Sequence, residues 1–185
     1  MAGGVNLYAY AGGNPIAFGD PFGLCPEGTS AGRAFGVGLR VVIECSDGTN
    51  EIRTGGTRSW RNNNPGNLRN YSFSMRHGSI GQAGSKSTGD FAVFPDLQTG
   101  QAARAALLRL PKYASMTLES AISAYAPASE NDVQAYITAL VKQTGIARDD
   151  VLGDLADARM RDLLDAMQKH EGFREGTVHY ERRTE

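Results

Sequence analysis

The sequence has few of the residues that build metal centres. Its 185 residues include two cysteines, Cys25 and Cys45, and three widely spaced histidines, His77, His170 and His179. It contains no CxxC pair and no Cys/His cluster, so we expect neither a structural zinc site nor a histidine-metal nuclease, and we predict no cofactor. The two cysteines can form at most one disulfide, which we expect only if the chain works in an oxidising compartment.

Long apolar runs are also missing. No stretch approaches the roughly 20 residues needed to cross a bilayer, so we expect no membrane span. Residues 1–24 have neither a basic start nor a long apolar centre, so they do not read as a signal peptide, and export would need another carrier. Hydrophobic residues make up 41% and charged residues 21%, a balance typical of one globular domain with extensions.

Acidic residues are absent between Ile52 and Gly89. The same stretch holds six basic residues: Arg53, Arg58, Arg61, Arg69, Arg76 and Lys86. Such a stretch could meet phosphate groups or the carboxylates of cell-wall peptides, or it could be a solvated loop.

Residues 1–24 differ in composition from the rest of the chain. They contain NLYAYAGGNPIAFGDPFGL, which is rich in Gly, Pro, Asn and aromatic residues and has no helical period. The segment resembles the end of an Rhs/YD-repeat core, whose PxxxxDPxGL signature matches Pro15, Asp20, Pro21, Gly23 and Leu24. The resemblance implies self-cleavage between Leu24 and Cys25 with Asp20 in the cleavage chemistry, and release of a toxin from the core shell. A plain Asp-Pro turn is the alternative.

The remaining chain is expected to be mainly helical. Residues 25–60 read as a linker and a β-hairpin, because LRVVIEC at residues 39–45 is followed by the turn signal Asp47-Gly48. Residues 61–94 are rich in loops, and helices are expected over 99–110, from 117 to before Pro127, over 129–143, after Arg148, and over 156–170. Ser129 and Asp132 form a capping-box pattern.

The last of these helices places a carboxylate on an apolar face. Met160, Leu164 and Met167 share one helical stripe, and Glu171 extends it at the C-terminal end. Burial and the negative end of the helix dipole both favour a protonated carboxyl there, which suits a general acid. The alternative is a frayed helix end with Glu171 turned to water.

A second resemblance covers roughly residues 58–175. RNNNPGNLR, FAVF, AYAPASENDVQAYI and HEGF follow one another in the order found in a phage-encoded family of the lysozyme-like superfamily. The resemblance implies a mainly α (α+β), lysozyme-like helical domain with a small β-hairpin region, circularly permuted so that the helix carrying the catalytic Glu comes last. The domains would then be 1–24, 25–60, 61–176 and a tail at 177–185. One departure is the short tail of 14 residues after Glu171.

The resemblance also implies site residues. Glu171 would be the general acid/base, and residues expected to bind substrate are Asn63, Asn64, Asn67, Arg69, Tyr125, Glu130 and Tyr136. The asparagines offer amide donors and acceptors to sugar groups, although Asn-rich turns also occur without a function. The tyrosines could equally be core residues, Glu130 could simply favour a helix dipole, and Asp90 or Asp96 could be a second carboxylate or a turn cap.

These features lead to one preferred function and two alternatives. We expect a secreted antibacterial toxin that cleaves peptidoglycan glycan strands in the periplasm of the target cell and is neutralised by a cognate immunity protein. No clear second acid is present, which favours a lytic transglycosylase slightly over a muramidase. The alternatives are an Rhs-tip nuclease, which the basic stretch supports although no nuclease metal cluster is present and no nucleic-acid partner is expected, and a non-catalytic wall-binding module.

The signature at residues 15–24 gives a direct prediction. In the full-length parent we expect cleavage after Leu24, so that N-terminal sequencing of the released toxin begins at Cys25. An intact Leu24–Cys25 bond in the active toxin would exclude this processing.

Overall fold

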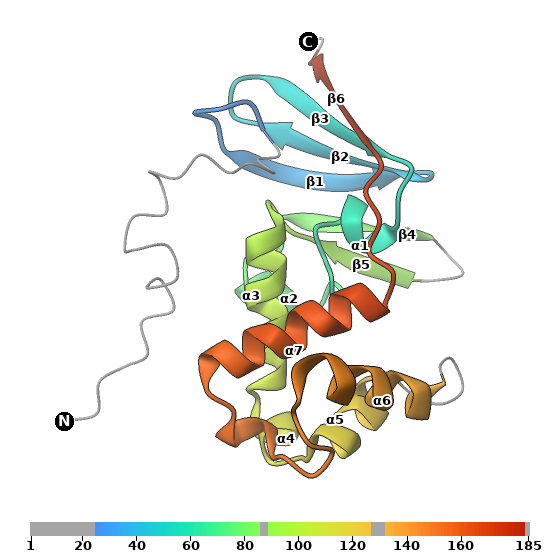
Figure 1. Cartoon of the computed structure of the whole chain (residues 1–185). Helices are drawn as coiled ribbons and strands as arrows, with labels where there is room; N and C mark the ends of the chain where they lie inside the picture. The colour runs from blue at the N-terminus through green and yellow to red at the C-terminus, as the bar shows by residue number, and fades with distance from the viewer. Residues whose placement is uncertain (1–24, 86–88, 127–131, 184–185) are drawn as a thin grey trace, which may run out of the picture.

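A mixed β-sheet occupies one end of the molecule and a group of helices occupies the other (Figure 1). The computed structural model describes residues 25–85, 89–126 and 132–183. In these residues six strands follow the order β5-β4-β1-β2-β3-β6, and only the β1–β4 pair is parallel. The strands are β1 (Ala31–Val37), β2 (Arg40–Cys45), β3 (Thr49–Thr54), β4 (Gly81–Ser85), β5 (Gly89–Val93) and β6 (Thr177–Arg182).

The β2–β3 hairpin confirms the turn expected from Asp47-Gly48. Gly48 has a φ of 83°, a left-handed conformation that glycine adopts without steric cost. The Asp47 carboxylate accepts a hydrogen bond of 3.0 Å from the Thr49 backbone N–H, which fixes the turn. One side of the sheet is buried in a small apolar cluster. The cluster contains Val41 and Ile43 of β2 together with apolar residues of the neighbouring strands.

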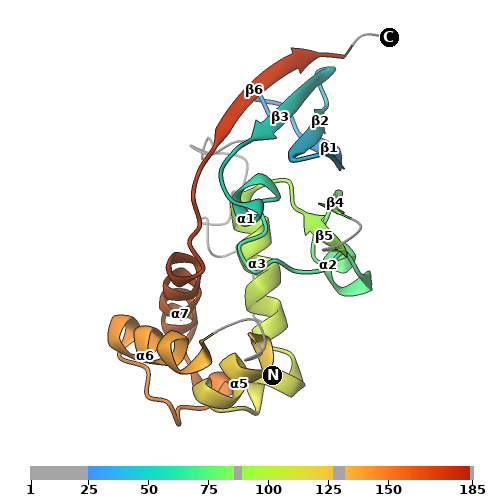
Figure 2. The same ribbon diagram turned by 90° about the vertical axis from the view of Figure 1, so that its right-hand side faces the viewer.

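Strand β6 comes from the segment expected to be a tail. It pairs with β3 in an antiparallel register that runs from Thr54↔Thr177 to Thr49↔Arg182. In Figures 1 and 2 the chain leaves the last helix and rises along the molecule to this edge of the sheet. Glu171, at the end of that helix, is therefore connected to the sheet by the short segment that leads into β6.

The helices match the expected positions closely where strong caps are present. Asp96, Thr117 and Asp132 each accept a hydrogen bond from a backbone N–H in the first turn of a helix. Gly145 ends one helix with a φ of 67°. The helices are α1 (Arg58–Arg61), α2 (Ser72–Arg76), α3 (Leu97–Leu108), α4 (Pro111–Ala114), α5 (Leu118–Tyr125), α6 (Val133–Thr144), the 3-10 turn η2 (Leu152–Asp154) and α7 (Asp157–His170).

The helical end has its own core. Apolar side chains of α5, α6 and α7 pack together, among them the fully buried Leu118, Ile137, Leu163 and Met167. Helix α3 runs from the sheet end to this core in both views, beside α7 (Figures 1 and 2). No helix in the described ranges is long and apolar enough to span a membrane.

The expectation of a mainly helical, lysozyme-like fold is wrong. The described residues form an α+β fold in which a six-stranded mixed sheet accompanies seven α-helices. Strands β1, β4 and β6 extend the predicted hairpin into this sheet, and their pairings join segments far apart in the chain. The small hairpin inferred from residues 39–54 is thus the centre of a much larger sheet.

A disulfide ties the beginning of the described chain to the sheet. Cys25 is bonded to Cys45, 20 residues later at the end of β2. Asp20 and Leu24, the expected cleavage residues, lie outside the described residues. If cleavage falls after Leu24, the new N-terminal residue is covalently held to the sheet.

The loop length gives the expected effect of this disulfide on stability. Closing a loop of about 20 residues lowers the entropy of the unfolded chain and stabilises the fold by about 3 kcal/mol. We expect reductant to lower the free energy of unfolding by this amount in urea titrations. A Cys25→Ala/Cys45→Ala variant is the control and should not respond to reductant; equal stability of oxidised and reduced wild type would contradict the prediction.

Candidate active site

Glu171 lies at the C-terminal cap of α7. Its backbone N–H donates to the Met167 carbonyl at 2.9 Å, so the helical geometry continues through this residue. Gly172 then turns the chain with a φ of 73°. The Glu171 side chain is only 19% exposed, which excludes the alternative of a frayed helix end turned to water.

The partner of Glu171 is a fully buried arginine on α3. Arg104 donates a hydrogen bond from Nη2 to Glu171 Oε1 and forms an ion pair with it, with no exposure of its own side chain. Burial alone would lower the pKa of this guanidinium, but Glu171 and the nearby tyrosine hydroxyls outweigh that effect and raise it. The sequence predicted an apolar environment for Glu171, whereas the structure places a permanent cation against it.

Tyr136 of α6 holds the same carboxylate oxygen. Its hydroxyl donates to Glu171 Oε1 at 2.6 Å. Burial, followed by the charge of Glu171, raises the pKa of Tyr136, so the phenol remains a neutral donor. The His170 ring stacks on Tyr136 with a centroid distance of 4.1 Å and an interplanar angle of 11°. The consecutive residues His170 and Glu171 therefore contact one tyrosine and fix its orientation.

The loop containing NNPGN packs behind this cluster. Tyr125 of α5 donates from its hydroxyl to the Gly66 carbonyl at 2.8 Å, and the Arg104 guanidinium lies 5.3 Å from the Tyr125 ring centroid. Burial raises the pKa of Tyr125 to about 12, although the charge of Arg104 opposes the shift. A Cβ on Gly66 would lie 3.1 Å from both the Tyr125 oxygen and an Arg104 carbon, so only glycine fits here without displacement.

Two asparagines of this loop form hydrogen bonds to backbone carbonyls. Asn63 and Asn64 are buried, and Asn63 adopts a φ of 49°, which asparagine tolerates better than most residues. Asn63 Nδ2 donates to the Phe94 carbonyl at 3.0 Å, and Asn64 Nδ2 donates to the Leu68 and Ala92 carbonyls at 2.8 and 2.9 Å. Their amide groups fasten the loop to β5 and the segment after it, so neither is placed to meet a sugar directly.

The other predicted site residues are distributed unevenly. Asn67 and Arg69 are exposed at the end of the loop, and Glu130 lies outside the described residues. Asp96 caps α3 by accepting a hydrogen bond of 2.6 Å from the Thr99 backbone N–H, while Asp90 is exposed on β5. The structure therefore brings together Glu171, Tyr136, Tyr125 and the loop, and within the described residues no other carboxylate forms a hydrogen bond or ion pair with Arg104, Tyr125 or Tyr136.

Sequence reasoning missed Arg104. The residue lies on the buried stripe of α3 formed with Gly100 and Leu108. The stretch QAARAALL gave a signal, because an arginine four residues from both Gly100 and Leu108 shares their helical face. A charged residue on an apolar stripe indicates a buried partner of opposite charge. Glu171, the acidic residue on the apolar stripe of the last helix, was the candidate for that partner.

The two oxygens of Glu171 have different surroundings. Oε1 accepts from Arg104 and Tyr136, whereas Oε2 accepts no hydrogen bond from any described residue. Because both donors act on Oε1, the orientation of the carboxyl plane is fixed and Oε2 is the oxygen left without a hydrogen-bond donor among the described residues. This arrangement can perform general acid and general base catalysis at one defined atom.

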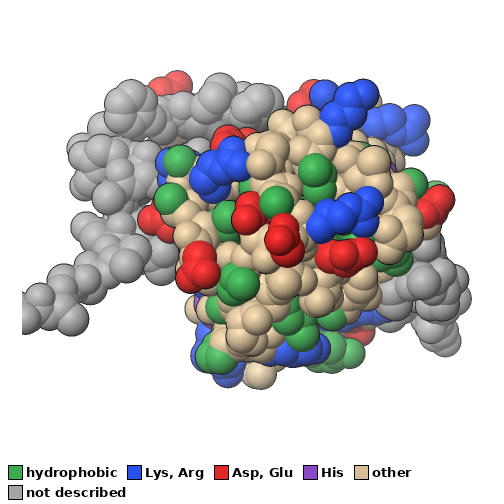
Figure 3. Space-filling model, turned by 60° about the horizontal axis from the view of Figure 1, so that its bottom comes forward, with side chains coloured by type: hydrophobic (Ala, Val, Ile, Leu, Met, Phe, Trp, Pro, Cys, Tyr) green, Lys and Arg blue, Asp and Glu red, His purple; other side chains and the backbone are tan. Residues whose placement is uncertain are grey.

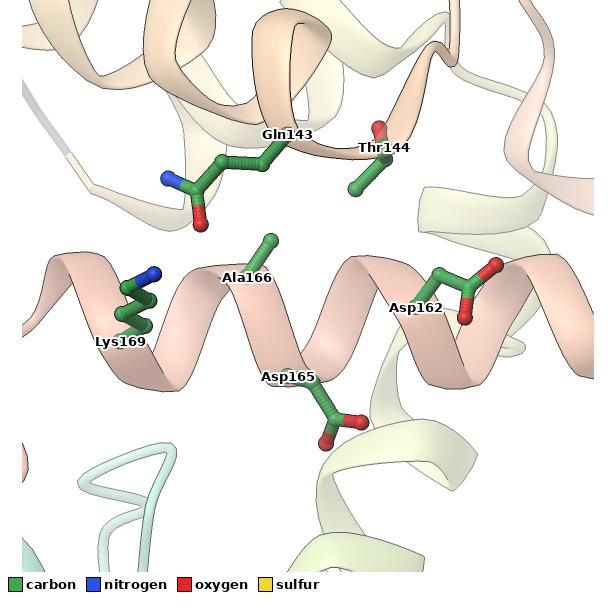
Figure 4. A pocket seen from close by; sticks show the side chains of 6 residues that line it. All are labelled: Gln143, Thr144, Asp162, Asp165, Ala166 and Lys169. Atoms are coloured by element: carbon green, nitrogen blue, oxygen red, sulfur yellow. The ribbon is translucent and has the colours of Figure 1, made fainter.

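Other features of the described surface do not bring several polar side chains together on one catalytic group. A depression of about 430 Å³ between α6 and α7 is lined by Gln143, Thr144, Asp162, Asp165, Ala166 and Lys169. Figure 4 shows Asp165 directed away from the α6 side of this depression. Acidic side chains gather on the face of the helical end seen in Figure 3. In the described ranges no three His, Cys, Asp or Glu side chains are grouped to hold a metal ion.

The burial of Arg104 gives a testable energetic prediction. Glu171→Gln leaves a fully buried cation without its anion, and we expect it to lower the free energy of unfolding by about 3 kcal/mol. Adding Arg104→Met removes the orphaned charge and should recover part of that loss. Urea titrations of the two single variants and the double variant measure this coupling.

Glu175→Gln is the matched control for this cycle, because Glu175 is exposed beyond Gly172. We expect no measurable change in stability. Strictly additive effects of Glu171→Gln and Arg104→Met would show that the two side chains are not coupled in solution.

Comparison with known proteins assigns no family to this chain. No family model matches the sequence, and no curated protein matches it. The chemical role of the Glu171 cluster therefore follows from its own geometry and from the motifs that form it.

Proposed function

We propose that this protein cleaves the glycan strands of bacterial peptidoglycan, with Glu171 as the general acid and base. The observation that carries the proposal is the carboxylate of Glu171, held at Oε1 by Arg104 and Tyr136 with Oε2 left for proton transfer. The sequence motifs support the same chemistry, since the NNPGN loop contacts Arg104 and Tyr125 through Gly66 and the HEGF helix end carries Glu171 itself. The proposal needs no lysozyme-like architecture, because function resides in a site rather than in a fold.

The reaction begins with the protonated form of Glu171. Oε2 donates its proton to the glycosidic oxygen, the bond from that oxygen to C1 breaks, and positive charge develops on the sugar ring. The sugar's own 6-hydroxyl then attacks C1, and Oε2 takes the proton that this hydroxyl loses. The products are a shortened strand and a 1,6-anhydro end, and Glu171 returns to its starting state.

A single carboxylate suffices for this route. A hydrolase of the usual kind employs a second carboxylate at a defined separation to activate water or to attack the sugar. In the part of the chain that the structure describes, Glu171 is the only acid in contact with Arg104 and Tyr136. The geometry therefore favours a lytic transglycosylase over a muramidase.

Arg104 and Tyr136 are positioning residues in this proposal. Both contact Glu171 rather than the sugar, and both come from helices different from α7. Their hydrogen bonds hold Oε1 in place while Oε2 gains and loses a proton, so the catalytic atom keeps its position during both steps.

The setting of the reaction is part of the proposal. The signature of residues 15–24 supports release from an Rhs-type parent chain, and the disulfide of Cys25 supports action in an oxidising compartment such as the periplasm. A toxin of this kind requires a cognate immunity protein in the producing cell.

The activity test compares variants on purified peptidoglycan. We expect Glu171→Gln to lower the rate of glycan cleavage by two orders of magnitude or more, the scale of losing a general acid. The Glu171→Gln/Arg104→Met double variant should be more stable than Glu171→Gln and equally inactive, because stability is partly restored and the proton donor is not. Mass spectrometry of wild-type products should show 1,6-anhydro ends.

Two controls separate chemistry from folding. Leu164→Ala creates a cavity in the core of α7 and is expected to destabilise the protein by about 2–5 kcal/mol, yet it should keep most of the activity below its unfolding temperature. Glu175→Gln should be silent. Full activity of Glu171→Gln, or toxicity of the wild type only when it is retained in the cytoplasm, would contradict the proposal, and the second result would favour a nuclease.

A further inference from the structure

Two arginines lie over the ring of Phe91 on β5. The Arg58 guanidinium is 4.1 Å from the ring centroid and the Arg69 guanidinium is 4.2 Å from it. Arg69 also forms an isolated antiparallel bridge with Phe91, so its backbone is fixed beside the ring. Phe91 is buried, and the three side chains form one stacked unit on the surface of the sheet end.

Positive charge accumulates around this unit. Arg61 lies one helical turn after Arg58 on α1 and donates to the Gly55 and Gly56 carbonyls at 2.7 and 2.8 Å. Burial lowers the pKa of Arg58, with a further contribution from Arg69, and burial and then Arg58 lower the pKa of Arg61. Neither Arg58 nor Arg61 forms an ion pair with a described residue.

Arg58 has the geometry of an anion receptor. A guanidinium stacked on an aromatic ring keeps its N–H groups in the plane, where they can form a two-pronged contact with a carboxylate. Arg58 donates no side-chain hydrogen bond to any described residue. Its side chain is half-buried and stacked on Phe91. Because the stacking already restricts the side chain, less conformational entropy is lost when it binds a ligand.

The stacked unit is close to the Glu171 site on two sides. Thr57, the residue before Arg58, donates its backbone N–H to the Arg174 carbonyl at 3.0 Å, three residues after Glu171. Arg69 ends the loop whose Gly66 packs on Arg104. Figure 1 shows α1 near the segment that connects α7 to β6. These contacts link the elements that carry Arg58 and Arg69 to the elements that carry Glu171 and Arg104.

We propose that Arg58, supported by Arg61 and Arg69, binds a carboxylate of the peptide stems carried by the glycan strand that Glu171 cleaves. The inference rests on the proposed function and adds a specificity element to it: the enzyme prefers strands that bear peptides. The planar fork of a stacked arginine matches the geometry of a carboxylate. Arg58, Arg61 and Arg69 all come from the stretch Ile52 to Gly89, which contains no acidic residue.

The test compares two forms of one substrate. Intact peptidoglycan and peptidoglycan whose stems have been removed by an amidase are digested by the full chain and by Arg58→Ala. We expect the wild type to prefer intact strands by about tenfold or more in kcat/KM, on the scale of a charge-assisted hydrogen-bonded pair. Arg58→Ala should lose that preference through a higher KM on intact strands, with an unchanged kcat/KM on bare strands.

Arg58→Lys and Arg33→Ala make the test specific. Arg58→Lys keeps the charge and removes the planar fork, so it should retain only part of the preference. Arg33 is an exposed arginine of β1 that stacks over Phe35 at 5.3 Å, so Arg33→Ala removes the same kind of contact elsewhere and should keep the full preference. Circular dichroism melts of each variant establish that the protein is folded in the assay.

The outcomes distinguish this inference from the proposed function. If the wild type cleaves both substrates equally, or if Arg58→Ala lowers cleavage of both by the same factor, the stem-binding inference fails while glycan cleavage stands. If the wild type cleaves neither substrate, both fail. Arg58-dependent binding of an RNA oligonucleotide with no Arg58-dependent binding of free stem peptide would also overturn the inference, since the cluster would then be a phosphate site.

Discussion

The ion pair between Arg104 and Glu171 is the constraint on which the rest of the molecule depends. A guanidinium with no solvent exposure costs several kcal/mol in desolvation unless an anion and further hydrogen-bonding groups surround it. Here Glu171 at the end of α7 supplies the anion, Tyr136 on α6 hydrogen-bonds the same carboxylate, and the Tyr125 ring on α5 lies 5.3 Å from the guanidinium, whereas Nε and Nη1 of Arg104 have no hydrogen-bond partner among the described residues. Helices α5, α6 and α7 must all be packed in place before Arg104 can be buried. The position of one charged residue on α3 therefore depends on the packing of several elements between the sheet end and the helical end.

The sequence predicted local structure well and the sheet poorly, for the same physical reason. Helices α5 and α7 and the β2–β3 hairpin are determined by neighbouring residues: the Thr117 cap, the Gly172 stop and the Asp47-Gly48 turn. Strand β6 is short and polar, and it becomes a strand only by pairing with β3 more than 100 residues earlier. Nothing in TVHYER itself identifies that partner, because register across a sheet is set by contacts that local propensity does not record. The lysozyme-like expectation failed for this reason, since it treated the hairpin as a minor appendage.

The candidate site was predictable in part. The helical phase of Met160, Leu164 and Met167 led to Glu171, because a carboxylate on an apolar stripe is costly and therefore informative. The same phase argument applied to Gly100 and Leu108 would have found Arg104. The asparagines show where composition misleads: an amide side chain that can bind a sugar can equally bind a backbone carbonyl, and Asn63 and Asn64 are buried doing so. Only the burial of their side chains distinguishes the two roles.

The Glu171 carboxylate stabilises the fold by pairing with Arg104, and it is also the group to which the proposal assigns catalysis. Replacing Glu171 by a neutral residue removes the proposed proton donor and leaves Arg104 without its anion, so we expect activity and stability to fall together. The two effects can be separated only by changing Arg104 as well, because Tyr136 by itself offers no negative charge to the buried cation. The two oxygens of the carboxyl group have different surroundings: Oε1 accepts hydrogen bonds from Arg104 and Tyr136, and the proposed proton transfer takes place at Oε2. Protonation at Oε2 would neutralise the whole carboxyl group and weaken its ion pair with Arg104, but Oε1 could still accept hydrogen bonds from Arg104 and Tyr136, so α3, α6 and α7 would stay connected through this group during the proposed proton transfer.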